Sequence, residues 1–169
     1  NGAGKTTFVK LLLRFYDPDE GTILYNGTDI REYDIASIRN RLATVFQDYK
    51  VFALTISENV LCRELLNDKD ETIVKNAIKN SGAETCVEKL PQKASTVLTR
   101  EFDEKGTGLS GGEQQKIAAA RMFAKDFDLA ILDEPSSALD PIAEYKMYES
   151  LIEATKEKSE KKSGHGGKS

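Results

Sequence analysis

The first seven residues have the composition of a loop that binds phosphate. Gly4-Lys5-Thr6 completes the pattern GxxxxGK[ST], whose first glycine would precede residue 1, so we expect a fragment that begins inside this motif. Backbone N–H groups of such a loop surround the phosphates, Lys5 reaches the β and γ oxygens, and the Thr6 hydroxyl holds Mg²⁺. The alternative is a glycine-rich helix start with an exposed lysine. The residues predicted to bind phosphate are Asn1, Gly2, Ala3, Gly4, Lys5, Thr6 and Thr7.

A second anion site is predicted at Ser110-Gly111-Gly112-Glu113. A serine followed three residues later by glutamate is a capping box, so we expect a helix to begin at Ser110. Gly111 and Gly112 leave the backbone N–H groups of its first turn uncovered, at the positive end of the helix dipole, where a phosphate can approach. The alternative is a helix start softened by glycine that has no ligand. This motif alone does not decide between the two.

Two acidic residues follow an apolar run late in the chain. Residues 127–132 are apolar except for Asp128, which predicts a buried parallel strand. Asp133 and Glu134 come directly after it, at the edge where open α/β sheets bind ligands. With a phosphate loop upstream, we expect Asp133 to fix Mg²⁺ and Glu134 to orient or deprotonate the water that attacks the γ-phosphate. The alternative is a surface turn.

The segments between these motifs predict alternating helices and strands. The evidence is hydrophobic periodicity together with turn and cap signals, such as Asn26-Gly27 for a hairpin turn and Asp17-Pro18 after a helix. The expected elements are a helix over 8–15, a strand at 21–25, a short helix over 35–41, a strand over 42–46, two helices between 68 and 89 with Ile73, Val74, Ala77 and Ile78 on one stripe, and a helix from Pro141 to Ile152.

Three stretches, residues 1–7, 109–113 and 129–134, resemble in this order the nucleotide-binding domain of an ABC transporter. The second is similar to the signature motif of that family. The resemblance implies an α/β fold, with a P-loop NTPase (RecA-like) core, a small antiparallel β region and an inserted helical subdomain. It implies ATP and Mg²⁺ as cofactors and ATP hydrolysis as the activity. The implied parts are a core incomplete at both ends (1–48 and 126–158), a helical subdomain (49–125) and a polar tail (159–169).

The resemblance also implies roles for single residues. Gln47 corresponds to the glutamine of the Q-loop, which touches Mg²⁺ and senses the γ-phosphate; an amide offers an acceptor to a metal and donors to water. Asp140 belongs to a match with the D-loop, which lines the contact with a partner domain. Glu104 matches a loop that passes motion to the membrane part in exporters, and an exposed acidic loop is the alternative there.

The family resemblance implies a head-to-tail homo- or heterodimer of two nucleotide-binding domains. The loop at Lys5 of one domain binds ATP, and residues 110–112 of the other close over the γ-phosphate. Residues 52–60 resemble the matching segment of exporters in which ATPase and transmembrane permease share one chain. The resemblance implies that the ATPase part lies at the cytoplasmic face of the membrane. Tyr49, Val51 and Phe52 are then candidate contacts with the permease, and packing inside the domain is the alternative. We expect the isolated chain to fold marginally and to hydrolyse ATP weakly or not at all.

Composition bears on compartment and partners. A net charge of −4 with 31% charged residues argues against a surface for nucleic acid. Cys62 and Cys86 lie far apart without a CxxC pair, which predicts free thiols in a reducing compartment. No apolar segment approaches the length of a transmembrane helix, so a membrane part would lie on another segment or chain.

A soluble ABC ATPase that acts on nucleic acid or ribosomes is the rival hypothesis. The short distance from Lys5 to Asp133 excludes the long coiled-coil insertion of chromosome-maintenance relatives. The absence of CxxC pairs disfavours the DNA-repair type with zinc modules, and the acidic charge weakens the ribosome-bound type.

The end of the chain departs from the family pattern. Residues 156–169 contain no large apolar residue, so the apolar strand that carries the family's switch histidine is missing. His165 lies at about the right spacing, yet residues 159–164 cannot form a buried strand. We therefore predict a disordered tail in which His165 has no function.

Overall fold

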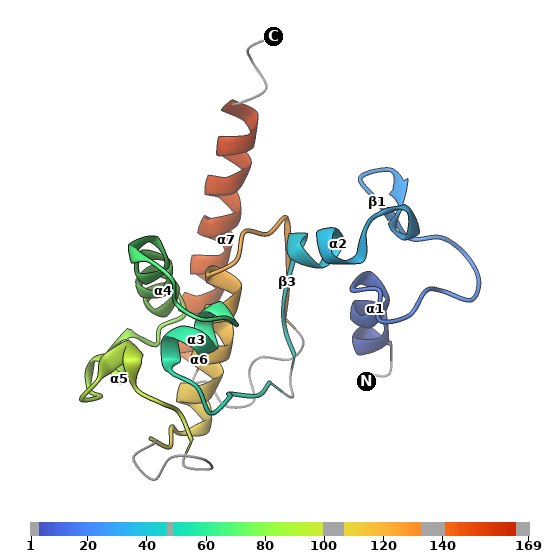
Figure 1. Ribbon diagram of the computed structural model, residues 1–169. Coiled ribbons are helices and arrows are strands. Elements are labelled where there is room, and N and C mark those ends of the chain that lie inside the picture. Colours follow the sequence, from blue (N-terminus) through green and yellow to red (C-terminus); the bar gives the residue numbers. More distant parts are fainter. Residues whose placement is uncertain (1–3, 47–48, 100–106, 133–140, 165–169) are drawn as a thin grey trace.

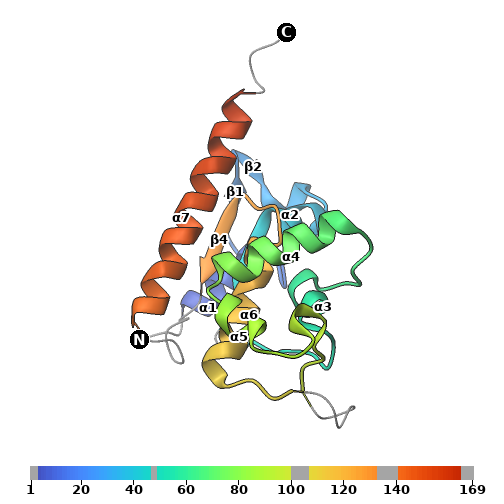
Figure 2. The same cartoon turned by 90° about the vertical axis from the view of Figure 1, so that its left-hand side faces the viewer.

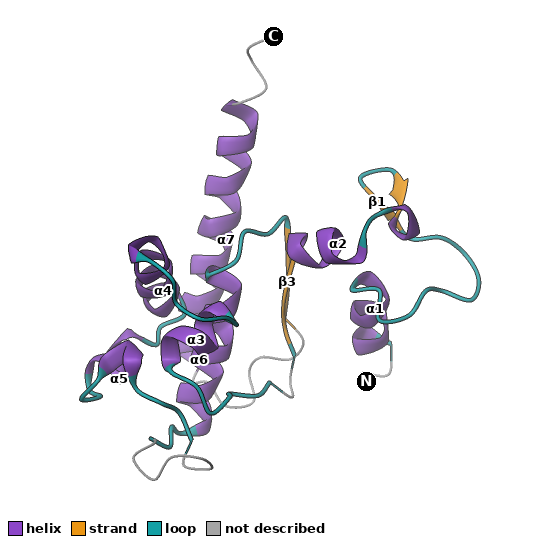
Figure 3. Cartoon of the chain, in the orientation of Figure 1, coloured by secondary structure: helices purple, strands orange, loops and turns teal. Residues whose placement is uncertain are grey.

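The computed structural model describes residues 4–46, 49–99, 107–132 and 141–164. Figure 3 shows that helices dominate these ranges. The helices are α1 (Lys5–Leu12), α2 (Ile35–Arg41), α3 (Ile56–Leu61), α4 (Asp68–Asn80), α5 (Glu84–Glu88), α6 (Gly111–Phe123) and α7 (Pro141–Gly164), with the 3-10 turns η1 (Ile30–Glu32) and η2 (Lys93–Ser95). The strands are β1 (Leu24–Tyr25), β2 (Thr28–Asp29), β3 (Leu42–Val45) and β4 (Leu129–Leu132).

Strand β3 separates two groups of elements (Figure 1). Helices α1 and α2 and the β1–β2 hairpin lie on one side of it, and helices α3 to α6 lie on the other. We call the first group together with β3 and β4 the nucleotide part, and α3 to α6 the helical part. Among the described residues, no helix is both long enough and apolar enough to cross a membrane.

Strands β3 and β4 form a parallel pair between two layers of helices. Side chains alternate along the pair, so Leu42 and Ile131 pack with α1 and α2, in a cluster that includes Val9 and Ile38. On the opposite face Ala43, Val45, Ala130 and Leu132 pack with residues of α6 and α7, including Leu151 of α7 (Figure 2). The pairing of Val45 with Leu132 brings both strands to an end at the same edge.

The hairpin and the end of α1 follow from local chemistry. Asn26 and Gly27 both have positive φ, 51° and 83°, as the tight turn of an antiparallel hairpin requires. Helix α1 ends at Leu12, earlier than the periodicity predicts, and Arg14 then adopts a φ of 50°. Arg39 donates hydrogen bonds to the carbonyls of Leu13 and Arg14, at 2.8 and 2.9 Å, and satisfies this helix end.

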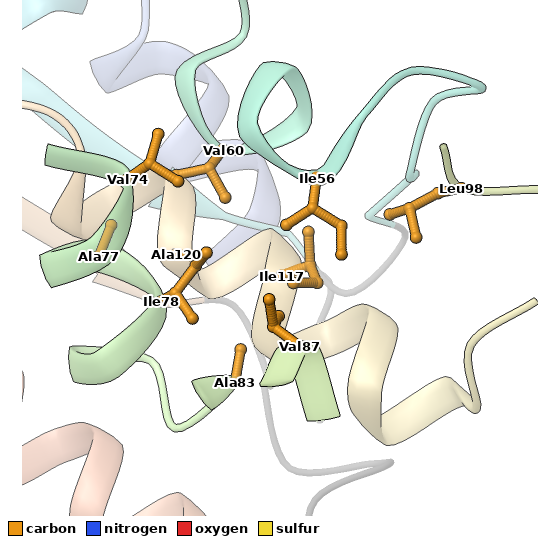
Figure 4. Packing of buried hydrophobic residues seen from close by; sticks show 10 residues of the cluster. All are labelled: Ile56, Val60, Val74, Ala77, Ile78, Ala83, Val87, Leu98, Ile117 and Ala120. Atoms are coloured by element: carbon orange, nitrogen blue, oxygen red, sulfur yellow. The ribbon is translucent and has the colours of Figure 1, made fainter. Parts of the chain in front are cut away.

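The helical part has a single apolar core. Ten buried residues from α3 to α6 and the intervening loops form it, and Figure 4 shows their side chains: Ile56, Val60, Val74, Ala77, Ile78, Ala83, Val87, Leu98, Ile117 and Ala120. Of the stripe predicted on α4, Val74, Ala77 and Ile78 belong to this core. Ile73, the fourth residue of that stripe, lies outside the core and is 37% exposed.

The predicted tail is also corrected in part. Residues 159–164, expected to be disordered, continue helix α7 to Gly164. The missing apolar residues exclude a buried strand, but a helix closes its hydrogen bonds within its own backbone. Glu and Lys, which are frequent from residue 153 onward, are strong helix formers. His165 lies outside the described residues.

Candidate functional site

The start of α1 carries the described part of the phosphate loop. Gly4 is its N-cap, and no side chain among the described residues caps the helix. Among the described residues, a Cβ at Gly4 would meet no atom within 4 Å. Lys5 and Thr7 are exposed and Thr6 is half-buried. Asn1, Gly2 and Ala3 lie outside the described residues.

The start of α6 has the capping box that the sequence predicts. The Ser110 hydroxyl donates to the Glu113 carboxylate at 2.7 Å, and it accepts from the Glu113 N–H at 3.4 Å. The Ser110 N–H donates to the same carboxylate at 2.9 Å. These hydrogen bonds lower the pKa of Glu113, which therefore stays ionised. The box uses only Ser110 and Glu113; Gly111 is exposed and Gly112 is partly buried.

Helix α6 is held firmly behind this start. Six of its thirteen residues are buried, and it packs against α3 and α4 through Ile117 and Ala120. Gln114 donates from its side-chain amide to the Leu109 carbonyl at 2.8 Å, which fixes the residue before the cap. Lys125, just past the helix, donates to the Leu42 carbonyl at 3.0 Å and joins α6 to the start of β3.

Sequence reasoning missed a set of polar contacts between α6 and the segment of residues 49–59. The Tyr49 hydroxyl donates to the Gly111 carbonyl at 2.9 Å. Arg121 donates to the backbone carbonyl of Asn59 at 2.9 Å and to its side-chain oxygen at 3.1 Å. Its guanidinium lies 5.1 Å from the centre of the Phe52 ring. These partners are about sixty residues apart along the chain, so no local pattern could have indicated them.

The three candidate permease contacts lie in different environments. Phe52 is 50% exposed, whereas Val51 packs against the core of the helical part and Tyr49 is partly buried. Interior packing, the alternative considered for this segment, therefore holds for Val51. Both cysteines are free thiols, with Cys62 exposed and Cys86 partly buried.

Several predicted site residues lie outside the described residues: Gln47, Glu104, Asp133, Glu134 and Asp140. Strands β3 and β4 precede Gln47 and Asp133 in the sequence. The described ends of these strands, Val45 and Leu132, are register partners.

Comparison with known proteins agrees with this arrangement. The sequence profile of the ABC transporter family matches residues 1–137. The chain belongs to the ABC transporter family. The mitochondrial iron-sulfur clusters transporter ATM1 of Candida glabrata is 41% identical over 151 residues, which is 89% of this chain and 20% of that protein. The ATP-dependent lipid A-core flippase of Alcanivorax borkumensis is 38% identical over 151 residues, 89% of this chain and 25% of that protein.

A solved structure supports the fold of this family member. A bacterial Atm1-family ABC exporter with ATP bound superimposes with a TM-score of 0.78 at 34% identity, over 90% of this chain and 26% of that one. The predicted α/β P-loop NTPase fold is thereby confirmed. The chain spans about a fifth to a quarter of the length of these relatives.

Proposed function

We propose that this chain is the ATP-binding and ATP-hydrolysing part of an ABC exporter that powers transport across a membrane. The observation that carries the proposal is the pair of open helix starts, at Gly4-Lys5 and at Ser110-Gly111-Gly112, in a chain of this family. Each start lies at the positive end of a helix dipole, which favours a bound phosphate.

The described residues of the first start fit a nucleoside triphosphate. The first turn of α1 contains no acidic residue, Gly4 has no side chain, and the exposed Lys5 adds a positive charge. In the proposed site residues 1–7 hold the phosphates, and Glu134 orients the attacking water, with Gln47 beside it. Mg²⁺, held by Thr6, Gln47 and Asp133, would neutralise charge on the β and γ phosphates.

The proposed partners are a second nucleotide-binding domain and a transmembrane permease domain. In a head-to-tail dimer Ser110, Gly111, Gly112 and Asp140 of one copy face the ATP held by the other copy. The half-exposed Phe52 and the exposed Leu54 offer apolar contact area to a permease at the cytoplasmic face of the membrane. In this proposal residues 1–48 and 126–158 form the core, and residues 49–125 form the helical subdomain.

ATP hydrolysis by the full-length protein that carries residues 1–169 tests this function. Lys5→Ala should lower the affinity for ATP about 10- to 100-fold, because a hydrogen bond from a charged donor to the phosphates is lost. Lys69→Ala removes an exposed lysine from α4 and is the matched control. Equal affinity and equal hydrolysis rates in both variants would contradict the proposal.

A further inference from the structure

The Tyr49 hydroxyl joins the segment after Gln47 to the start of the signature helix α6. It donates to the Gly111 carbonyl at 2.9 Å. Burial raises the pKa of Tyr49, so the hydroxyl keeps its proton and remains a donor at neutral pH. Gly111 is the first residue of α6, so this bond acts directly on the proposed phosphate-facing turn.

The hydrogen bond from Tyr49 involves the carbonyl of Gly111 and not its N–H. Within the described part of the chain, the N–H groups of Gly111 and Gly112 donate no hydrogen bond. Carbonyl groups of a helix point away from its N-terminus, whereas the first N–H groups point out of it. Tyr49 can therefore fix the position of this turn while its N–H groups stay available to a phosphate.

The other end of the same segment is fixed to α6 by a buried network. Asn59 is fully buried, and its side chain exchanges hydrogen bonds with the backbone N–H and carbonyl of Phe52, at 2.8 and 2.9 Å. Arg121 of α6 donates to Asn59 and covers the Phe52 ring. Hydrogen bonds and a ring contact therefore join residues 52–59 to the last turn of α6.

A cavity of about 160 Å³ lies between Val51, Leu109 and Gln114, beside the start of α6. Val51 and Leu109 also pack against the core of the helical part, and Gln114 donates to the Leu109 carbonyl at 2.8 Å. The Tyr49 hydrogen bond adds a direct polar contact between residue 49 and Gly111, the first residue of α6.

We propose that Tyr49 is a positioning residue, which holds the Gly111-Gly112 turn in the orientation that closes over the γ-phosphate. A displacement of the segment after Gln47 then moves the start of α6 through this hydroxyl, while the Asn59–Arg121 network stays fixed. The reference to ATP rests on the proposed function. The claim that Tyr49 sets the position of the turn does not.

Tyr49→Phe, made in the full-length protein, removes only the hydroxyl. The matched control is Tyr33→Phe, which removes a hydroxyl that donates to the Tyr25 carbonyl at 3.0 Å in the nucleotide part. Tyr49→Phe should lower kcat for ATP about 3- to 10-fold, as expected for one lost hydrogen bond. ADP affinity should stay unchanged, because ADP has no γ-phosphate, and amide hydrogen exchange over residues 110–115 should become faster. Tyr33→Phe should show neither change.

Each outcome decides the inference. Equal rates and equal exchange in the two variants would overturn it. A fall in kcat without faster exchange would overturn the positional claim, and faster exchange with unchanged kcat would overturn the catalytic one. A fall in ADP affinity would mean that Tyr49 acts on the Lys5 site. If Lys5→Ala hydrolyses ATP normally, the proposed function fails, and hydrogen exchange still tests the position of the turn.

Discussion

The two helices whose starts we propose to face ATP differ in how well they are packed. Helix α6 buries six of its thirteen residues and belongs to the ten-residue core of the helical part. Helix α1 buries only Val9 among its eight residues, and Phe8 on it is 56% exposed. Large apolar side chains are also exposed elsewhere in the nucleotide part, including Phe15 and Leu24.

The start of α6 is therefore the better packed of the two helix starts. The signature helix is positioned by the core of the helical part, by a buried polar network and by its contact with β3. Helix α1 packs on the layer beside β3 and β4 through Val9, its one buried residue. We therefore expect core substitutions in the helical part to have the largest effects on stability, and equivalent changes on α1 to have small ones.

Of the substitutions that test this difference, Ile117→Ala should have the largest effect on stability. Ile117 is fully buried at the contact of α6 with α3 and α4, so the substitution leaves a cavity and should cost about 2–5 kcal/mol in free energy of unfolding. Phe8→Ala, on the exposed face of α1, should cost less than about 0.5 kcal/mol. Urea denaturation of both variants measures the difference. Similar costs would show that the two helices are equally well packed.

Asn59→Ala should have the next largest effect. It leaves the Phe52 N–H without its acceptor in a buried site and removes one of the two Asn59 acceptors of Arg121, so it should destabilise the helical part by about 1–3 kcal/mol. The matched control is Asn80→Ala at the exposed end of α4, where we expect little change. Thermal unfolding of the two variants compares them. A stability of Asn59→Ala equal to that of the control would mean that the network contributes nothing.

Asp70 should make a smaller contribution to the stability of the helical part, and this contribution should depend on pH. Paired hydrogen bonds from Arg63, with a further one from the Leu66 N–H, lower the pKa of Asp70 from 3.8 to about 2. A lowered folded-state pKa stabilises above the unfolded value, so this contribution is complete above about pH 4 and is lost as the pH falls through about 2. Unfolding curves between pH 2 and pH 5 should have a shallower pH dependence for Asp70→Asn. An unchanged slope would contradict the assignment.

Local signals predicted the parts of the site that depend on neighbours in the sequence. The capping box at Ser110, the Asn26-Gly27 turn and the helix over 35–41 were predicted because each is set within a few residues. The contact of Tyr49 with Gly111 could not be predicted, since it depends on how two distant segments fold together. The end of α7 was mispredicted because the absence of apolar residues was read as disorder. The roles of Gln47, Asp133 and Glu134 stay predictions.

The central claim is that one ATP is held between the start of α1 of one copy and the start of α6 of the other. It can be tested with two defective full-length chains, Lys5→Ala and Gly111→Asp. Gly111 is exposed, and an acidic residue suits the first turn of a helix, so Gly111→Asp should fold normally while it repels phosphate. Each variant alone should be inactive.

Co-expression with two different affinity tags, followed by purification on both tags in turn, isolates the mixed dimer. In a head-to-tail arrangement one of its two sites combines an intact Lys5 with an intact Gly111, and the other site lacks both. We predict that the mixed dimer hydrolyses ATP at about half the wild-type rate, because symmetry leaves one complete site per dimer. A mixed dimer as inactive as either variant alone would contradict the shared site.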